Sequence, residues 1–542
     1  MKYTIVFTLM LLSSITSGQV KTAKIFSDNM VLQREIPIPV WGTAQPSEQI
    51  TVKLEKTVVQ TISDTKGNWK LNLPKFQAGG PFTLSIEGIQ NKIEFHNVLI
   101  GDVWLASGQS NMEHPMEGWE WIPYSAVNDS KKEIKDSNYS GIRLFNVPKF
   151  PSPVVQKDLP SGKWKVAGPE SVAGFSAIGW FFAKEMHQKL KIPIGIINSS
   201  WGGTAIQTWM GRESLETFKD SLNLPVVPEK FDQNEWTKKV AGSIEKTKLR
   251  RMQISYPPKD LPFPGYPPDT LGAAWKNVDL LAKDNKFGSV VWLQKKVTVP
   301  FKFVKQHLEL SLGFLSWQSQ VFLNGQEIGY FPYPKPVVTE LPRHLIRSGE
   351  NLLTIRLAQP WGDAQCLGIK EQFYLSNPNH SFKVPLSDGW LANGSLEVIT
   401  TGVESYPNNP AYLYNGMVAT IIPYGIKGFI WYQGEADAGR PSLYSQMFTK
   451  LITDWRKVWI QGDLSFLFFQ ISTYPLTHEQ DKKTDPWKKQ REAQATALSL
   501  PNTGMVITYD IGDTYDIHPK NKKEFAHRMV IKAFELNIKS KN

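Results

Sequence analysis

The sequence contains almost no cysteine. Cys366 is the single cysteine among 542 residues, so an internal disulfide framework is excluded and paired thiolate ligands for a metal are absent. Metal-binding patterns such as H-E-x-x-H and His-x-His are missing too, and "WGGTA" lacks both the lysine and the spacing of a nucleotide-binding loop. We therefore expect no metal and no cofactor.

Long apolar runs are absent after residues 1–18. That first segment combines Lys2, an apolar stretch and small residues that end near Gly18, which is typical of a signal peptide cleaved at this point. No later run approaches the ~20 apolar residues of a membrane-spanning helix. We expect an exported bacterial protein, periplasmic or secreted, that has no membrane span.

A concentrated basic surface is also lacking. The formal net charge is +11, but Lys and Arg residues are interspersed with acidic residues and form no stripe. Nucleic-acid binding would call for such a stripe, so we expect no nucleic-acid partner. The 19 Trp residues are numerous. Indole rings stack well on sugars, although Trp is equally a core residue, so a carbohydrate partner is a mild expectation and the oligomeric state stays open.

The chain alternates between β-rich and mixed segments, and its length exceeds what one hydrophobic core usually organises. Residues 19–97 show short β-type runs about ten residues apart, which predicts an N-terminal β-sandwich. Residues 98–270 and 394–542 alternate strands with helices, which predicts two parts of one α/β domain with a parallel sheet. Residues 271–393 predict an inserted all-β module with an "NG" hairpin turn.

Ser110 follows a predicted strand in "WLASGQSNM". Open α/β sheets carry their sites at the carboxyl ends of strands, so Ser110 is a candidate nucleophile. The elbow pattern G-x-S-x-G is absent, because Met112 replaces the second glycine. From this stretch alone, a helix-capping role for Ser110 is the favoured interpretation.

Two further loops follow predicted strands. In "NSSWGGTAIQTW", the adjacent Gly202 and Gly203 allow backbone N–H groups to approach a ligand, as an oxyanion hole requires. In "WYQGEADAG", Gln433 is a candidate side-chain donor to the same oxyanion, and Glu435 is a candidate ligand for a substrate hydroxyl. Taken separately, each loop is also explained as an ordinary turn, with Glu435 near a helix N-terminus.

The fourth loop, "DIGDTYDIHPKNKKEF", contains His518. This histidine is a candidate general base, and Asp516 and Asp513 are candidates for the carboxylate that orients it. A lone histidine in a loop is usually structural. Because the four loops leave the same end of one parallel sheet, however, we expect them to converge into a site for nucleophilic attack by a serine.

Together these loops resemble the SGNH hydrolases of GDSL type, and more closely the sialate O-acetylesterase family of carbohydrate esterases. The resemblance rests on "GDVWLASGQSNMEHPM", "GIINSSWGGTAIQTWM", "GFIWYQGEADA", "KKQREAQ" and "GDTYDIHPKNKKEF". It implies an SGNH-hydrolase-like three-layer α/β domain with an inserted module of jelly-roll type. It also implies a serine carboxylic-ester hydrolase that removes O-acetyl groups from sugars.

Carried onto this sequence, the resemblance implies that Ser110 is the nucleophile and His518 the general base. The oxyanion donors that it implies are the backbone N–H of Ser110, that of Gly203 or Gly202, and the side chain of Gln433. Residues of the motifs that we expect to contact the substrate are Gln109, Asn111, Trp209, Glu435 and Arg491.

This sequence departs from the family pattern in three ways. The acid usually stands three residues before the histidine, where this chain has Tyr515. Asp516 is the first alternative, Asp513 the second, and a Ser–His dyad the third. Ala436-Asp437 replaces the usual Ser-Asn pair. The family often continues past the last helix, so we expect a C-terminal β-segment to be absent from this chain.

Other functions stay open at this point. A carbohydrate-binding protein without catalysis would use the same β-modules. A glycosidase would need two carboxyl groups across the sugar site, for which the loops offer only Glu435 and the aspartates near His518. Acetylated sialic acids, xylan and pectic side chains are equally compatible with the sequence. Trp119 and Trp121 flank the motifs, as cleft residues or as packing.

Overall fold

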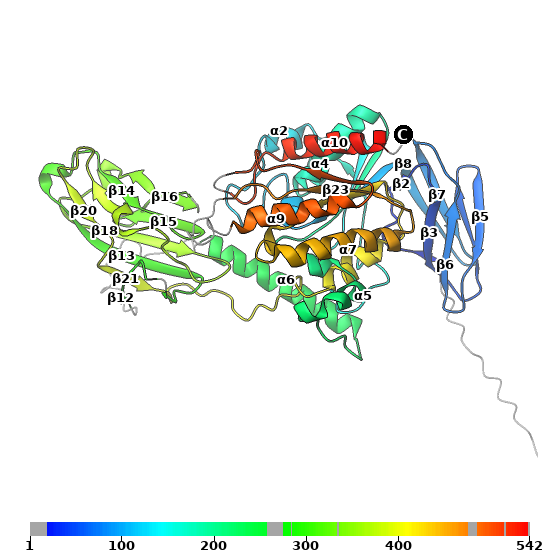
Figure 1. Cartoon of the computed structure of the whole chain (residues 1–542), viewed down its shortest axis with the longest axis horizontal. Coiled ribbons are helices and arrows are strands. Elements are labelled where there is room, and N and C mark those ends of the chain that lie inside the picture. The colour runs from blue at the N-terminus through cyan, green and yellow to red at the C-terminus, as the bar shows by residue number, and fades with distance from the viewer. Residues whose placement is uncertain are drawn as a thin grey trace, which may run out of the picture.

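The computed structural model describes residues 19–256, 275–282, 284–332, 335–474, 485–513 and 516–539. Figure 1 shows the N-terminal strands at one end, a layered body of helices and strands in the middle, and an all-β module at the other end. The predicted signal peptide at 1–18 lies outside the described residues, as do residues 271–274 at the start of the predicted module.

A largely parallel sheet lies at the centre of the molecule. Its strands run in the order β10-β9-β11-β8-β22-β23-β24, and each neighbouring pair is parallel except β10 with β9. The strands are β8 (Lys92–Gly108), β9 (Tyr139–Asn146), β10 (Lys165–Ala167), β11 (Ile194–Ser200), β22 (Gly428–Tyr432), β23 (Ser465–Phe469) and β24 (Thr503–Val506). Most of these residues are buried, as expected for a parallel sheet covered on both faces.

Helices cover both faces of this sheet (Figure 1). Side chains alternate along β23, so that Phe466 joins the apolar cluster of one face and Leu467 that of the other. The helices of the two faces are α7 (Pro441–Trp459) and α9 (Pro486–Ala495) on the first, and α4 (Ala177–Leu190) and α10 (Lys522–Lys539) on the second. The predicted alternation of strands and helices is confirmed in this body.

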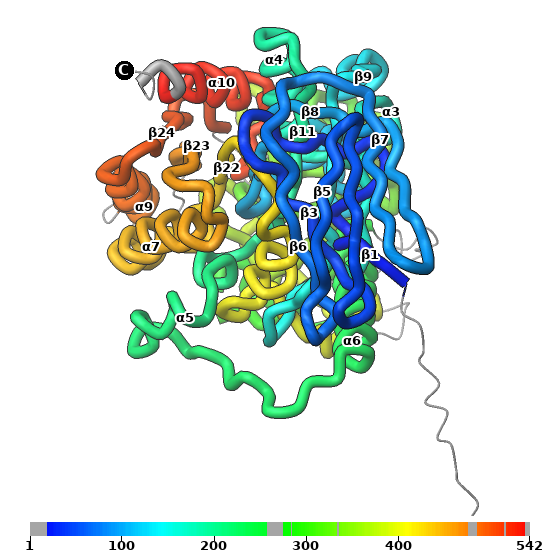
Figure 2. Tube along the Cα trace, turned by 90° about the vertical axis from the view of Figure 1, so that its right-hand side faces the viewer, coloured from blue at the N-terminus to red at the C-terminus, as the bar shows by residue number. Residues whose placement is uncertain are grey.

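The N-terminal strands form two small sheets, seen in blue in Figure 2. Their inward side chains, including Ile50 and Leu71, share one apolar cluster, because every second residue faces inward. One sheet contains β1 (Lys21–Thr22), β3 (Ile38–Thr43) and β6 (Asn68–Leu73). The other contains β4 (Gln49–Leu54), β5 (Thr57–Ile62) and β7 (Gly79–Glu87). Strand β7 also pairs with β8, and the short β2 (Val31–Gln33) pairs with β8 as well. Strand β8 therefore runs through the boundary predicted at 97–98.

The inserted module consists of two antiparallel sheets, in the orders β12-β21-β13-β18-β15-β16 and β17-β14-β19-β20. The strands are β12 (Lys276–Val278), β13 (Val290–Val299), β14 (Glu309–Leu312), β15 (Gln318–Leu323), β16 (Gln326–Pro332), β17 (Val338–Glu340), β18 (Gly349–Ala358), β19 (Phe373–Ser376), β20 (Lys383–Pro385) and β21 (Trp390–Asn393). The "NG" turn joins β15 to β16, with φ of 50° at Asn324 and 88° at Gly325. Positive φ at both positions is what a tight hairpin requires.

A long helix that the sequence pattern did not predict, α6 (Gln233–Ser255), reaches from the layered body to the module (Figure 1). Its C-terminal carbonyls accept hydrogen bonds from Arg356 of β18, whose guanidinium also pairs with Glu397. The shorter helices are α1 (Ser110–Glu113), α2 (Ser130–Lys135), α3 (Pro169–Ala173) and α5 (Arg212–Leu215). Among the described helices, none combines the length and apolar character needed to cross a membrane.

Candidate active site

The predicted convergence of the loops is present in the structure. Ser200 at the end of β11 and Tyr432 at the end of β22 both lie opposite Gly108 of β8. The loops after these three strands therefore begin at the same level of the sheet, at its carboxyl end. Ser110 opens the short helix α1 two residues beyond Gly108.

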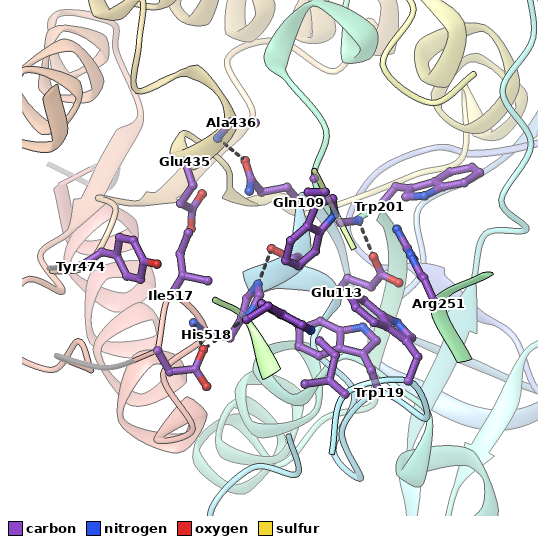
Figure 3. Close-up of a pocket in the computed structure, with 18 of the residues that line it drawn as sticks. Gln109, Glu113, Trp119, Trp201, Arg251, Glu435, Ala436, Tyr474, Ile517 and His518 are labelled. Atoms are coloured by element: carbon purple, nitrogen blue, oxygen red, sulfur yellow. Dashed lines mark hydrogen bonds and ion pairs between the residues drawn. The ribbon is translucent and has the colours of Figure 1, made fainter. Parts of the chain in front are cut away.

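Ser110 and His518 lie within hydrogen-bonding distance of each other. The Nε2 atom of His518 is 2.9 Å from the Oγ atom of Ser110. The indole of Trp119 packs edge-to-face against the His518 ring, with 4.9 Å between centroids (Figure 3). The same indole stacks on the ring of His114, with 4.2 Å between centroids. This packing restricts the orientation of the imidazole.

The His518 imidazole is held in its neutral form. Burial, reinforced by the nearby ammonium group of Lys522, lowers the pKa of His518 to about 3. A neutral imidazole accepts a proton from a hydroxyl, as a general base must. The geometry suits removal of the Ser110 proton, and the low pKa keeps the ring free to accept it but makes it a weaker base than an ordinary histidine.

Asp516 is the nearer of the two candidate acids to the histidine. Its Oδ1 atom accepts the backbone N–H of His518 at 2.8 Å and lies 3.6 Å from Nδ1 of the ring. The second distance exceeds an ordinary hydrogen bond, although such contacts are often longer in the absence of substrate. Asp513 lines a neighbouring cavity together with Asp516 and His518. Tyr515 lies outside the described residues.

Two backbone N–H groups remain for an oxyanion. The N–H of Gly202 donates to the carboxylate of Glu113, which also receives the ammonium group of Lys149. In contrast, the N–H groups of Ser110 and Gly203 donate to none of the described residues, and both residues line the same cavity. Of the two glycines predicted as alternatives, the structure therefore leaves Gly203 with a free donor.

The prediction that Gln433 supplies an oxyanion donor is wrong for this structure. Its side chain is fully buried, and its amide nitrogen donates to the Thr204 carbonyl at 3.1 Å and to Oδ2 of Asp437 at 2.5 Å. Asp437 belongs to the Ala436-Asp437 pair that replaces the usual Ser-Asn pair. Its buried carboxylate draws the amide of Gln433 away from the cavity. Gln433 therefore stabilises its own loop.

Gln109 links the serine loop to the loop after β22. Its Oε1 atom accepts the backbone N–H of Ala436 at 3.2 Å (Figure 3). The same atom accepts the backbone N–H of Gly434 at 3.4 Å. The side chain also lines the cavity. Gln109 is thus in the position predicted for a substrate contact and also ties two loops together.

Asn111 does not line the cavity; it connects three segments beneath it. Its Nδ2 atom donates to Glu435 at 2.6 Å and to the carbonyl of Ile517 at 3.0 Å. Its Oδ1 atom accepts the ammonium group of Lys522 at 2.6 Å. With 1% exposure, Asn111 holds the histidine loop in place, and the prediction of a substrate contact is wrong. Glu435 does line the cavity, as predicted.

Lys522 was not identified from the sequence, yet its side chain is fully buried near the candidate site. Burial lowers its pKa to about 7, against the attraction of the Asp516 and Glu435 carboxylates. In sequence it is one of several lysines at the start of a helix, which normally lie in solvent. No local pattern distinguishes it from its neighbours.

Trp209 and Arg491 are not at the cavity. Trp209 has 0% exposure, donates from Nε1 to Thr204 Oγ1 at 3.0 Å and packs against Trp431 in the core. Arg491 lies on α9, where its backbone carbonyl accepts a hydrogen bond from Gln470. Neither of these residues is part of the cavity wall, so both predictions of substrate contact are wrong for this structure.

The cavity over Ser110 has a volume of about 490 Å³ and is larger than the four loops alone would make it. Trp119 and Trp121 line it, so both serve as cleft residues. The inserted module and α6 contribute residues that the sequence did not reveal. These are Trp317, Gln359 and Trp361 from the module and Arg251 from α6.

Comparisons with known proteins agree with this arrangement. A family profile described as "Carbohydrate esterase, sialic acid-specific acetylesterase" matches residues 100–224 and 399–534. The two matched segments contain the Ser110 and His518 loops and are separated by α6 and the inserted module.

Mouse sialate O-acetylesterase is 24% identical over 95% of this chain and 73% of its own length. The human sialate O-acetylesterase is 31% identical over 36% of this chain and 39% of its own length. Among solved structures, a carbohydrate acetylesterase from Xanthomonas citri aligns with a TM-score of 0.58 at 24% identity, over 95% of this chain and 75% of that one. The chain therefore belongs to the sialic acid-specific acetylesterase family of carbohydrate esterases.

Proposed function

We propose that this protein is a carbohydrate O-acetylesterase that acts through an acyl-enzyme on Ser110. The observation that carries the proposal is the 2.9 Å contact between Ser110 Oγ and His518 Nε2. It lies in a cavity where two backbone N–H groups are free to receive an oxyanion. Membership in a family of carbohydrate esterases supports the same reaction class.

The reaction follows from this geometry. Ser110 Oγ attacks the acetyl carbonyl carbon while Nε2 of His518 takes the hydroxyl proton. The carbonyl oxygen becomes an oxyanion that accepts the N–H groups of Ser110 and Gly203. The protonated imidazole then gives its proton to the leaving sugar oxygen, and water attacks the acetyl-serine to release acetate by the same steps. Asp516 fixes the histidine backbone and lies nearest to Nδ1.

Several finer features belong to the same proposal. The three-layer body is of the SGNH hydrolase type and the inserted sheets are of the jelly-roll type. Acetylated sialic acids, which the names of the relatives suggest, are the first substrate class, with acetylated xylan and pectin as the alternatives. Residues 1–18 direct export to the periplasm or the exterior.

Replacement of Ser110 by alanine tests the proposal. Ser110→Ala should lower the rate of acetate release from O-acetylated sugars by at least about 10³-fold, because the nucleophile is removed, while the thermal unfolding curve stays unchanged. Ser200→Ala is the matched control. Ser200 ends the neighbouring strand and its hydroxyl donates to Asn198, so this variant should remain active.

Three results would contradict the proposal. Binding of acetylated glycan by the wild-type protein without release of acetate would indicate a carbohydrate-binding protein. Release of reducing sugar with retention of the acetyl groups would indicate a glycosidase that uses Glu435 and an aspartate. Full activity of Ser110→Ala would exclude Ser110 as the nucleophile.

A further inference from the structure

The inserted module forms one wall of the cavity that contains Ser110. Trp317 stands just before β15, and Gln359 and Trp361 directly follow β18. The facing wall contains Trp121, from the loop after α1, and Arg251 of α6. Segments far apart in the sequence thus meet over the nucleophile.

The three indoles form an open aromatic cluster. The rings of Trp121 and Trp317 are nearly parallel, with 18° between their planes and 6.3 Å between centroids. Trp361 stands edge-on to both, at 4.4 Å from Trp317 and 6.0 Å from Trp121. Trp361 nevertheless remains 60% exposed, so most of its apolar surface is not used to pack the module against the body.

Polar groups without partners lie beside these indoles. The Oε1 atom of Gln359 is buried and has no hydrogen-bond partner among the described residues. The guanidinium of Arg251 lies 4.5 Å from the centre of the Trp121 ring and makes no hydrogen bond or ion pair with a described residue. A buried acceptor costs free energy unless a protein group, a water molecule or a ligand donates to it. Gln359 therefore needs a donor, and Arg251 offers several.

This combination matches the chemistry of a pyranose ring. The C–H faces of a sugar pack on indoles, its hydroxyl groups donate to an amide oxygen, and its oxygen atoms accept from a guanidinium. A volume of about 490 Å³ exceeds the needs of an acetyl group and falls in the range of roughly 300–1,000 Å³ that holds larger ligands.

We propose that Trp121, Trp317 and Trp361, with Gln359 and Arg251, form a second sugar subsite shared between the module and the hydrolase body. It holds a pyranose unit next to the acetylated one, so the preferred substrate is an acetylated oligosaccharide and not a free acetylated monosaccharide. The assignment of the neighbouring unit as acetylated rests on the proposed function; sugar binding at the subsite does not.

Trp361→Ala tests this subsite by separating its contribution from the chemistry at Ser110. KM for O-acetylated xylotetraose, or for O-acetylated sialyllactose if that is the better wild-type substrate, should rise about 5- to 10-fold through loss of ring stacking. The kcat/KM for 4-nitrophenyl acetate, which has no sugar, should stay within about twofold. Trp361→Phe, which keeps an aromatic ring, should recover part of the loss. Phe301→Ala is the control, since Phe301 is 81% exposed on the same module and lies outside the cavity.

A binding measurement keeps the subsite testable if the esterase proposal fails. In the Ser110→Ala background, calorimetric titration with the same oligosaccharides should show weaker binding when Trp361 is also replaced by alanine. Unchanged oligosaccharide KM and unchanged binding in the Trp361 variants would overturn the subsite. Equal loss of activity on the oligosaccharide and on 4-nitrophenyl acetate would also overturn it, because the cluster would then only pack the module.

Discussion

His518 and Lys522 are four residues apart, and burial lowers the pKa of both, to about 3 and about 7 respectively. Below pH 7 Lys522 is protonated, and its positive charge opposes protonation of His518. The neutral base therefore persists well below the ordinary histidine pKa of about 6.5. At the scale of single residues, burial of His518 and, after it, the charge of Lys522 set the acid limit of the proposed reaction.

Lys522→Met should move that limit. Removal of the positive charge raises the pKa of His518, so activity should be lost at a higher pH as the pH falls, while burial, the larger cause, still holds that pKa below the ordinary value of about 6.5. Above pH 7, where Lys522 is largely neutral, its charge contributes little to the pKa of His518. The pH profiles of the wild type and of Lys522→Met should therefore run parallel in this range. The pH dependence of kcat/KM for acetate release measures both regions.

Lys523→Met is the control for this pH shift, since the Lys523 side chain is 70% exposed and its charge is screened by solvent. Coincident acid limbs for the wild type and Lys522→Met would show that the lysine acts only by holding Asn111. A shift in Lys523→Met of the same size would show that general surface charge, and not Lys522, sets the acid limit.

The sequence identified Ser110, Gly203 and His518 because their positions follow directly from strand ends. It failed for Asn111, whose amide group is engaged by segments far away in the chain, and for Gln433, whose amide donates to the distant Thr204 as well as to the nearby Asp437. Whether the Gln433 amide is free depends on Thr204 and Asp437, and no spacing rule contains that information.

At the scale of elements, the end of β8 depends on a glycine. Gly108 has a φ of +131°, and a Cβ atom there would lie 2.1 Å from the carbonyl oxygen of Tyr432. Both the conformation and the close approach to β22 exclude other residues. The turn that presents Ser110 therefore requires this strand pairing.

Gly108→Ala should reduce both stability and esterase activity. The clash with the Tyr432 backbone should destabilise the fold by at least about 1–3 kcal/mol and displace Ser110 from His518; thermal unfolding and acetate release report the two effects. Gly242→Ala on α6 provides the opposite case. A Cβ atom at Gly242 meets nothing within 4 Å, so this change should stabilise the helix by about 0.5–1 kcal/mol. A Gly108→Ala protein as stable and active as the wild type would refute the close approach.

Elements with a regular apolar pattern were predictable, and α6 was not. Helix α7 buries a full face, including Met447 and Leu451, and was recognised. Helix α6 buries only Val240, Ile254 and Ser255 among its 23 residues. It has no apolar stripe, because most of its length faces solvent, and Arg251 was missed with it.

At the scale of the whole molecule, a buried ion pair joins the module to the hydrolase body. The side chains of Arg356 and Glu397 are 2% and 3% exposed, and their closest atoms are 2.7 Å apart. Trp292 of β13 donates to the same carboxylate, and the carbonyls of Gln253 and Ile254 on α6 accept from the guanidinium. The strand, the helix and the returning chain thus meet at one point.

Arg356→Met should destabilise the protein strongly. Loss of one partner leaves the Glu397 charge buried, which typically costs about 3–5 kcal/mol, and it frees the helix carbonyls. Thermal unfolding and limited proteolysis of the module measure the effect. Lys370→Met is the control, because its pair with Asp388 is 64% and 75% exposed and contributes about 0–1 kcal/mol. Equal effects of the two changes would mean that the buried pair does not hold the junction.

The insertion of an all-β segment into the α/β body was visible in the sequence, since the periodicity changes on both sides of it. Its contribution to the cavity was not visible. In the sequence, Trp317 and Trp361 are residues near strand ends, and nothing indicates that they line the cavity until the orientation of the module is known. That orientation depends on contacts such as those of Arg356, made between segments about 100 residues apart in the chain.

Strand β8 carries a mechanical consequence. Its 17 residues pair with β7 at one end and with β11 and β22 at the other, and Asn97, with a φ of 55°, interrupts the extended conformation within the strand. The N-terminal sheets and the nucleophile therefore depend on one shared strand, and they cannot separate without breaking strand pairs. Loss of the pairing between β7 and β8 would therefore loosen the same strand whose other end presents Ser110.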